Sequence, residues 1–198
     1  MRTSENRNFA RFFILIVILG AAGLRFVESA SPCLEYGKVF YTLAREDEKH
    51  NHWQKAERQY SKAIEFDPML ADAYSGLANV YLHDRKLDKS IESAQKAINL
   101  NPRHHQAYYT LGLAYRAKHE YAVALKSFAK AVELFPLFPD IPQYTYDLGI
   151  AYYDVGDEFN AKFCIHELRS LKQEEMAAQL ENTLHLYEPW SARRGIDK

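Results

Sequence analysis

The stretch that decides the fold is residues 105–136, which read HQAYYTLGLAYRAKHEYAVALKSFAKAVELFP. Its apolar residues recur every three or four positions in two blocks, which predicts two amphipathic helices. The polar run Lys118-His119-Glu120 separates the blocks and predicts a turn, and Pro136 stops the second helix because proline cannot continue it. The stretch is therefore predicted to be a pair of helices joined by a short turn.

The same pattern recurs along the chain with a period of 34 residues. The prolines show it most clearly, because Pro68, Pro102 and Pro136 are each 34 residues apart. The same spacing relates five further sets, which are Ala63, Ala97 and Ala131; Phe66, Leu100 and Leu134; Tyr74 and Tyr108; Leu77 and Leu111; and Tyr81 and Tyr115. Self-similarity at a fixed period of about 20 to 50 residues is the signature of a tandem array.

The repeated unit resembles the tetratricopeptide repeat (TPR). That family carries an aromatic residue, Leu-Gly, Tyr, Ala, Phe, Ala and Pro at fixed offsets in a 34-residue unit. Residues 105–138 carry all of them, as Tyr108, Leu111, Gly112, Tyr115, Ala124, Phe128, Ala131 and Pro136. Residues 71–104 depart only by small residues, and residues 37–70 have Asp47 where an aromatic is expected.

The resemblance implies an all-α fold, a right-handed superhelical solenoid of antiparallel helix pairs. We expect TPR units at 37–70, 71–104, 105–138 and 139–171. Because an array needs a cap over its last apolar face, the amphipathic stretch at 172–188 is predicted to be a capping helix. A linker at 31–36 and a tail at 189–198 complete the predicted organisation.

The N-terminus is a different kind of sequence. Arginines flank an unbroken apolar run at 12–24, with three before it and Arg25 directly after it. Thirteen apolar residues match the core of a secretory signal and fall short of the roughly 20 that span a bilayer. We expect residues 1–30 to be either a cleaved signal peptide or an uncleaved signal anchor. Either places the protein in the exported, periplasmic or secretory pathway, or at the membrane.

The stretch 133–144, ELFPLFPDIPQY, lies inside the array. Pro136 closes the third unit, and the fourth begins about three residues late because its matching positions lie 37 residues on. Pro142 suits the first turn of the next helix, where its missing N–H costs nothing. The apolar residues of the insertion either pack against the shifted fourth unit or form a rim contact for a partner; they are Phe135, Leu137 and Phe138.

Chemistry-bearing motifs are absent from the sequence. With 25 basic and 26 acidic residues, the chain has no electrostatic footprint for nucleic acid. No phosphate loop or zinc spacing occurs, so no catalytic residue, metal or cofactor is predicted. The histidine pairs His50/His52 and His104/His105 are expected in separate solvated turns. Cys33 and Cys164 are expected as free thiols, the first in a loop and the second packed, with a disulfide between them left open.

The resemblance implies that the first helix of each unit lines a concave groove that receives a peptide or a helix of a partner. Tyrosine and arginine on such a surface are typical binding hot spots, although packing between helices is an equal alternative for each tyrosine. Repeat offsets place these residues on the groove: Tyr41, Arg45, Ser75, Asn79, Leu82, His83, Tyr109, Leu113, Arg116, Ala117, Tyr146, Ile150, Tyr153 and Asp154.

Two functions follow from this surface. The first is a non-catalytic scaffold or adaptor that binds other proteins in an exported or membrane-anchored setting. The alternative is an accessory subunit that presents substrate to an enzyme of envelope-polymer synthesis or processing. Arrays that clamp a chaperone C-terminal carboxylate need basic and amide groups, and here only Asn79 matches; Tyr41, Gly76, Gln106 and Thr110 occupy the other positions.

Overall fold

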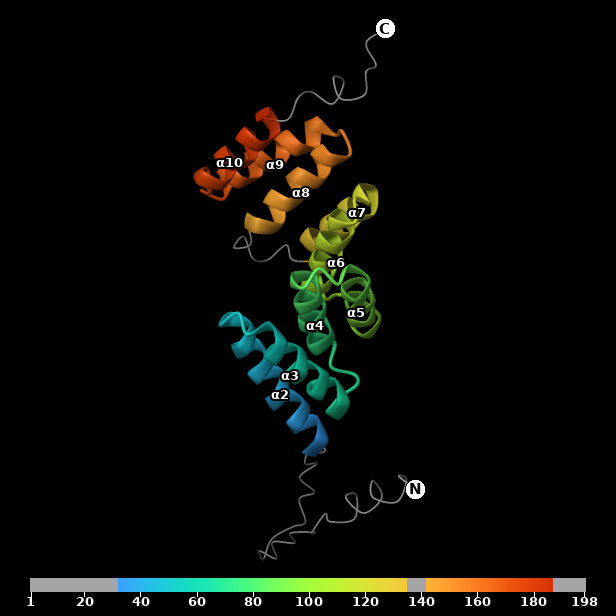
Figure 1. Ribbon diagram of the computed structural model, residues 1–198. Coiled ribbons are helices and arrows are strands. Elements are labelled where there is room, and N and C mark those ends of the chain that lie inside the picture. The colour runs from blue at the N-terminus through green and yellow to red at the C-terminus, as the bar shows by residue number, and fades with distance from the viewer. Residues whose placement is uncertain (1–31, 135–141, 187–198) are drawn as a thin grey trace, which may run out of the picture. The chain divides into compact units, whose positions relative to one another are not determined.

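The computed structural model describes residues 32–134 and 142–186, which belong to one compact unit and consist of α-helices joined by short turns (Figure 1). No strand occurs in these two stretches, so the all-α prediction is confirmed. The helices are α2 (Pro32–Lys49), α3 (Trp53–Phe66), α4 (Ala71–His83), α5 (Leu87–Leu100), α6 (His105–Ala117), α7 (Tyr121–Leu134), α8 (Pro142–Asp154), α9 (Glu158–Ser170) and α10 (Glu174–Leu186).

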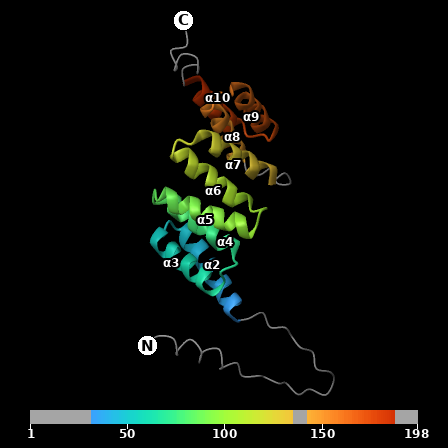
Figure 2. The same cartoon turned by 90° about the vertical axis from the view of Figure 1, so that its right-hand side faces the viewer.

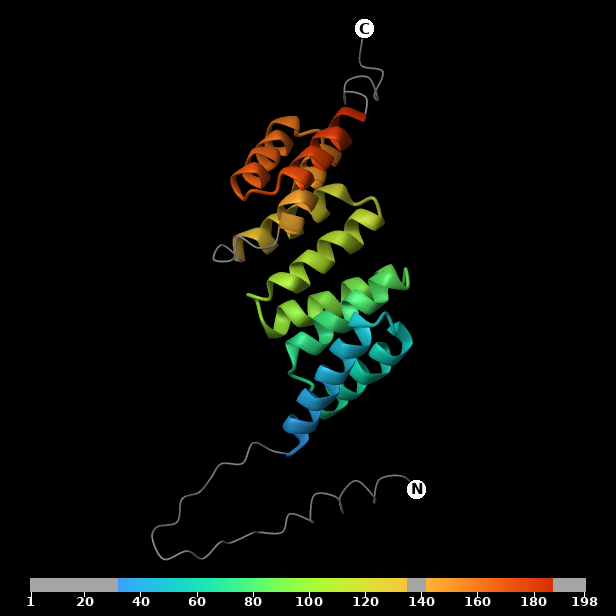
Figure 3. The ribbon, with the colours of Figure 1, turned by 90° about the vertical axis from the view of Figure 1, so that its left-hand side faces the viewer.

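The helices pack in chain order as a repeat solenoid. Each unit is a helix pair, α2 with α3, α4 with α5, α6 with α7, and α8 with α9 (Figures 2 and 3). The second helix of one unit then packs on the first helix of the next, so that α3 contacts α4, α5 contacts α6, and α7 contacts α8. Helix α10 contacts both α8 and α9, which is the position predicted for the capping helix.

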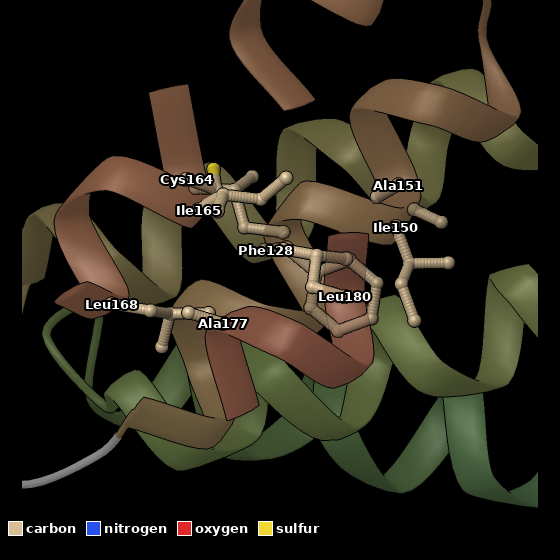
Figure 4. Close-up of a cluster of buried hydrophobic side chains, with 10 residues drawn as sticks. Phe128, Ile150, Ala151, Cys164, Ile165, Leu168, Ala177 and Leu180 are labelled. Carbon is tan, nitrogen blue, oxygen red and sulfur yellow. The ribbon is translucent and has the colours of Figure 1, made fainter. Parts of the chain in front are cut away.

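Small residues allow the helices to approach closely. Ala63, Ala97 and Ala131, one in each of the first three units, are completely buried. In the third unit the ring of Phe128 lies against Gly112, where an added Cβ would come within 2.8 Å of the ring. Figure 4 shows Phe128 of α7 in a cluster with residues of α8, α9 and α10, including Ile150, Cys164 and Leu180. This cluster joins the third unit, the fourth unit and α10 into one core.

The turns inside the units share a backbone feature. Asn51, Arg85 and His119 all have positive φ, of 59°, 59° and 63°, and lie 34 residues apart. In the fourth unit Gly156 takes this place, with φ of 86°. The repeat therefore extends to the left-handed residue that reverses the chain between the two helices of each unit.

Two predicted boundaries are tested by the helix ends. The predicted linker was wrong for residues 32–36, which form the start of α2, because proline fits the first turn of a helix and Glu35 interacts favourably with the helix dipole. Pro142 begins α8, as predicted. The possible rim residues Phe135, Leu137 and Phe138, the apolar run at 12–24 and the tail lie outside the described residues.

In the two described stretches, no helix combines the length and apolar character needed to cross a membrane. Cys164 is a free, buried thiol, as predicted, and burial raises its pKa to about 12. The backbone of Cys33 lies in α2 rather than in the predicted loop.

Candidate functional site

The predicted binding residues are carried by the first helices α2, α4, α6 and α8, whose common side we call the first-helix face. Contacts join α2 to α4 and α4 to α6. Side-chain hydrogen bonds then join α6 to α8, for example from Tyr109 to Asp147. The face is therefore continuous across all four units, and each of its interhelix contacts is held by polar groups.

Glu48 organises the first part of this face. Its carboxylate accepts a hydrogen bond of 2.6 Å from the Tyr60 hydroxyl of α3 and another from the side-chain amide of Asn79 on α4. Burial, followed by the hydrogen bond to Glu48, raises the pKa of Tyr60. The predicted binding residue Asn79 is thus engaged by a carboxylate within the protein, which would repel an incoming carboxylate at this point.

Tyr41 and Arg45 lie next to this contact on α2. The Tyr41 ring is partly buried and packs at a tilt on Tyr60, 6.0 Å between centroids, while Arg45 is exposed. Burial raises the pKa of Tyr41, and the nearby Asp72 carboxylate raises it further. Both residues keep accessible surface, so this end of the face offers a phenol and a guanidinium to a partner.

His104 is not in a solvated turn, contrary to the prediction, because it is only 7% exposed. Its Nδ1 accepts a hydrogen bond of 3.3 Å from the Ala107 N–H and so caps α6. Its Nε2 lies 3.0 Å from Asp72 Oδ1 on α4. With Nδ1 acting as an acceptor, Nε2 carries the proton and donates to Asp72. Hydrogen bonding by His104 lowers the pKa of the Asp72 carboxyl.

His83 lies at the edge of the face, stacked on Trp53 of α3 with the rings 3.9 Å apart and 17° from parallel. No motif in the sequence identified Trp53, which is the first residue of α3. His50 and His52 are exposed, as expected. In the described residues, no group of three or more His, Cys, Asp or Glu side chains is arranged to hold a metal ion.

Tyr109 connects the third and fourth units. Its hydroxyl donates to Asp147 Oδ2 at 2.6 Å, and Gln143 donates to the same oxygen at 3.0 Å. Its ring stacks on Tyr144 with centroids 4.0 Å apart. Burial raises the pKa of Tyr109, and the Asp147 charge adds to this effect. The packing alternative therefore describes Tyr109 better than the binding one.

Beside this contact, Arg116 Nε donates to Asp154 Oδ2 at 2.9 Å, while Leu113 and Tyr146 are partly buried. Ile150 and Tyr153 are only 9% and 7% exposed. Helix α8 contacts α10 as well as α7, so these two positions belong to the core and have little surface to offer a partner. This is a correction to the predicted groove.

A family model described as "Tetratricopeptide repeat" matches residues 69–136, and a second, "TPR repeat", matches residues 49–84. The chain is a tetratricopeptide repeat protein. Among curated relatives, this TPR chain is 36% identical over 75 residues to the Cell division cycle protein 27 homolog of Caenorhabditis elegans, covering 38% of this chain and 10% of that protein. It is 23% identical over 109 residues to human Tetratricopeptide repeat protein 33, covering 55% of this chain and 42% of that protein.

Solved TPR structures show the same fold. The Pseudomonas aeruginosa PilF structure matches with a TM-score of 0.64 and 20% identity over 82% of this chain and 81% of that one. The first TPR domain of Spaghetti (RPAP3), bound to an HSP90 peptide, matches with a TM-score of 0.57 and 20% identity over 62% of this chain and 94% of that one. At these identities the likeness concerns the fold alone. The chain spans less than half the length of the first curated relatives it matches.

Within this TPR array, the accessible part of the predicted set is smaller than the sequence indicated. Ser75 and Ile150 are buried, and Tyr109 is held between helices. The predicted residues that are exposed or only partly buried, and that remain candidates for binding, are Tyr41, Arg45, Asn79, Leu82, His83, Leu113, Arg116, Ala117, Tyr146 and Asp154. Binding by these residues stays a prediction.

Proposed function

We propose that this TPR protein is a non-catalytic interaction scaffold that binds an extended peptide or a helix of a partner protein on its first-helix face. The observation that carries the proposal is the continuity of that face over four units, with accessible Tyr41 and Arg45 at one end and Leu113 and Tyr146 at the other. A ligand lying along it would contact aromatic, cationic and apolar groups in succession, which are the groups enriched in binding hot spots.

The polar contacts within the face support a preformed site. Glu48 holds Asn79, and Asp154 pairs with Arg116. Side chains fixed in this way lose little conformational entropy when a partner binds, so more of the interaction energy is retained as affinity.

An acidic peptide, such as the HSP90 peptide seen with RPAP3, is not the ligand we propose. The Asn79 amide is already bound by the Glu48 carboxylate, and Gly76, Gln106 and Thr110 lack the charge to hold a second carboxylate. We propose instead a segment whose contacts are mainly apolar, with a hydrogen-bond acceptor placed to reach the exposed Arg45.

We propose that the protein acts in an exported or membrane-anchored setting, because arginines flank the apolar run at 12–24. Sequencing the N-terminus of the mature protein would test this. A mature chain that begins after about residue 30 indicates a cleaved signal, and an intact chain in the membrane fraction indicates an anchor. An intact chain found only in the soluble cytosolic fraction would contradict the proposal.

The binding proposal can be tested by cross-linking in cells followed by quantitative mass spectrometry of co-purified proteins. Arg45→Glu and Tyr146→Ala should each reduce recovery of the same partner several-fold. Phe159→Ala on α9 is a matched control, because Phe159 is 81% exposed and lies off the first-helix face. Recovery that is unaffected by both face variants would exclude this face as the binding site.

The same purification examines the alternative of an accessory subunit that presents substrate to an envelope-polymer enzyme. Enzymatic activity that co-purifies with the wild type and is lost with Arg45→Glu would favour that alternative. A stable partner without such activity favours the scaffold. Circular dichroism of each purified variant checks that the helices are intact.

A further inference from the structure

Helix α9 carries two exposed phenylalanines on its outer side. Phe159 and Phe163 lie four residues apart, so their side chains share one side of the helix, and they are 81% and 54% exposed. No described helix covers these two rings. The opposite side of α9 faces the core and is formed by Ala161, Cys164, Ile165 and Leu168. We call the surface formed by Phe159 and Phe163 the α9 pair.

The repeat shows that this surface is normally polar. The corresponding residues of the first three units are Gln54, Asp88 and Ala122 for Phe159, and Arg58, Glu92 and Lys126 for Phe163. All six are exposed, and five of them are polar or charged. The array therefore does not use this side of the second helix for packing between units. Two large apolar groups here, in the fourth unit, indicate a contact that the repeat itself does not supply.

The last described helix ends beside the start of α9. Helices α9 and α10 contact each other and are joined by a short turn at 171–173, so they are antiparallel (Figure 1). Leu180 and Cys164 lie at the same level, because both would contact a Cβ added at Gly149. Six residues beyond Leu180, α10 ends at Leu186, and six residues before Cys164, α9 begins at Glu158. The chain that follows α10 therefore starts close to the α9 pair.

We propose that the segment 187–198 folds back over the α9 pair and places Trp190 against Phe159 and Phe163. Trp190 is the one aromatic residue of 188–198, and Pro189 directly before it cannot continue a helix, which lets the chain leave α10 in extended form. Four extended residues reach about 14 Å, and neighbouring helices lie about 8–10 Å apart. Trp190, four residues after Leu186, therefore reaches the outer side of α9, where aromatic rings attract one another.

The order of charges supports this segment as the one that covers the α9 pair. Along α9 the exposed Lys162 comes before the exposed Glu167, and in the described residues neither belongs to an ion pair, since those of α9 and α10 are made by other side chains. In the segment, Glu188 comes before Arg193 and Arg194. Because the segment starts beside the first turn of α9, it runs toward the end of that helix. Its acidic residue then meets the lysine and its arginines approach the glutamate.

The test measures the exposure of Trp190 in the full chain, kept in a mild detergent. The chain has two tryptophans, so Trp53→Phe leaves Trp190 as the only indole. Acrylamide should quench the fluorescence of this parent several-fold less than it quenches a synthetic peptide of residues 187–198. Phe159→Ala combined with Phe163→Ala should raise the quenching constant about twofold or more, because Trp190 loses its aromatic contacts.

The matched control is Val39→Ala combined with Leu43→Ala on α2, where the side chains are 48% and 47% exposed, and it should leave the quenching unchanged. A photo-cross-linking amino acid in place of Phe163 should join α9 to residues 187–198 of the same chain. Quenching of the parent equal to that of the peptide, or quenching that the two alanines of α9 do not change, would overturn the proposal. Cross-links that form only between two chains would also overturn it. Circular dichroism checks that each variant is folded.

Discussion

At the scale of single residues, the turn inside each unit holds a strained position. Arg85 has φ of 59°, a conformation that disfavours a side chain by about 1–2 kcal/mol, whereas glycine adopts it freely. Because glycine also gives the unfolded chain more freedom, Arg85→Gly should raise the free energy of unfolding by about 0.5–1 kcal/mol, measured by urea denaturation. Arg103→Gly, at an exposed turn residue outside the positive-φ set, should lower it instead. If both variants were destabilised equally, the claim that Arg85 is strained at positive φ would be wrong.

A second residue-scale prediction concerns the Asp72–His104 contact between units. The pKa of Asp72 is held below its usual 3.8, mainly by the hydrogen bond from His104 and against the effect of burial. A lowered pKa in the folded state stabilises the protein above the unfolded pKa, and this stabilisation is lost as the pH falls through the folded value. The variant Asp72→Asn lacks this stabilisation at every pH.

The wild type should therefore be more stable than Asp72→Asn at pH 5, and this difference in stability should shrink as the pH falls through the lowered pKa of Asp72. The side chain of Asp72 is 58% exposed, so we expect a gap below about 1 kcal/mol. Urea denaturation followed by circular dichroism at each pH measures it. A difference in stability that does not change as the pH is lowered from 5 would show that the Asp72 charge does not contribute.

At the scale of helices, α10 closes the last unit. Leu180 is completely buried, and its methyl group would lie 2.6 Å from a Cβ added at Gly149 of α8. Leu180→Ala should lower the free energy of unfolding by about 2–5 kcal/mol, because the lost side chain leaves a cavity. It should also admit reagents to Cys164, which lies in the same cluster and whose thiol is kept protonated by burial, with a pKa of about 12.

The measurement for this prediction is the rate at which a thiol reagent labels Cys164, in a chain whose Cys33 is replaced by serine. Labelling should be faster in Leu180→Ala than in the parent. Val80→Ala is the control, because Val80 is also fully buried but belongs to the cluster of α2, α3 and α4. If both changes speed labelling equally, α10 does not protect Cys164 specifically.

The sequence predicts those features of the structure that depend on the regular spacing of apolar residues. The 34-residue period predicted the helix pairs, and the spacing of apolar residues at 172–188 predicted α10, because both signals are local in the sequence. It could not predict Arg85 at positive φ, because the usual glycine marker is missing there. It also could not show that Asp147 would bind Tyr109, since that hydrogen bond depends on how two units pack across the inserted residues. Ile150 lies in the same buried cluster as Leu180 of α10, and α10 lies outside the repeat.

At the scale of the whole array, stability is expected to be a sum of unit and neighbour terms, so damage at one junction should stay local. The junction of the third and fourth units contains a buried carboxylate, Asp147, which is 6% exposed and bound by Tyr109 and Gln143. Tyr109→Phe removes one donor and leaves that carboxylate poorly satisfied, which should destabilise the junction by about 1–3 kcal/mol. Hydrogen exchange should then become faster in α8, α9 and α10, with little change in α2 to α5. Tyr108→Phe, one residue earlier on α6, is the matched control and should leave hydrogen exchange in α8 to α10 unchanged. If Tyr109→Phe instead speeds exchange uniformly along the chain, the array unfolds as a single unit.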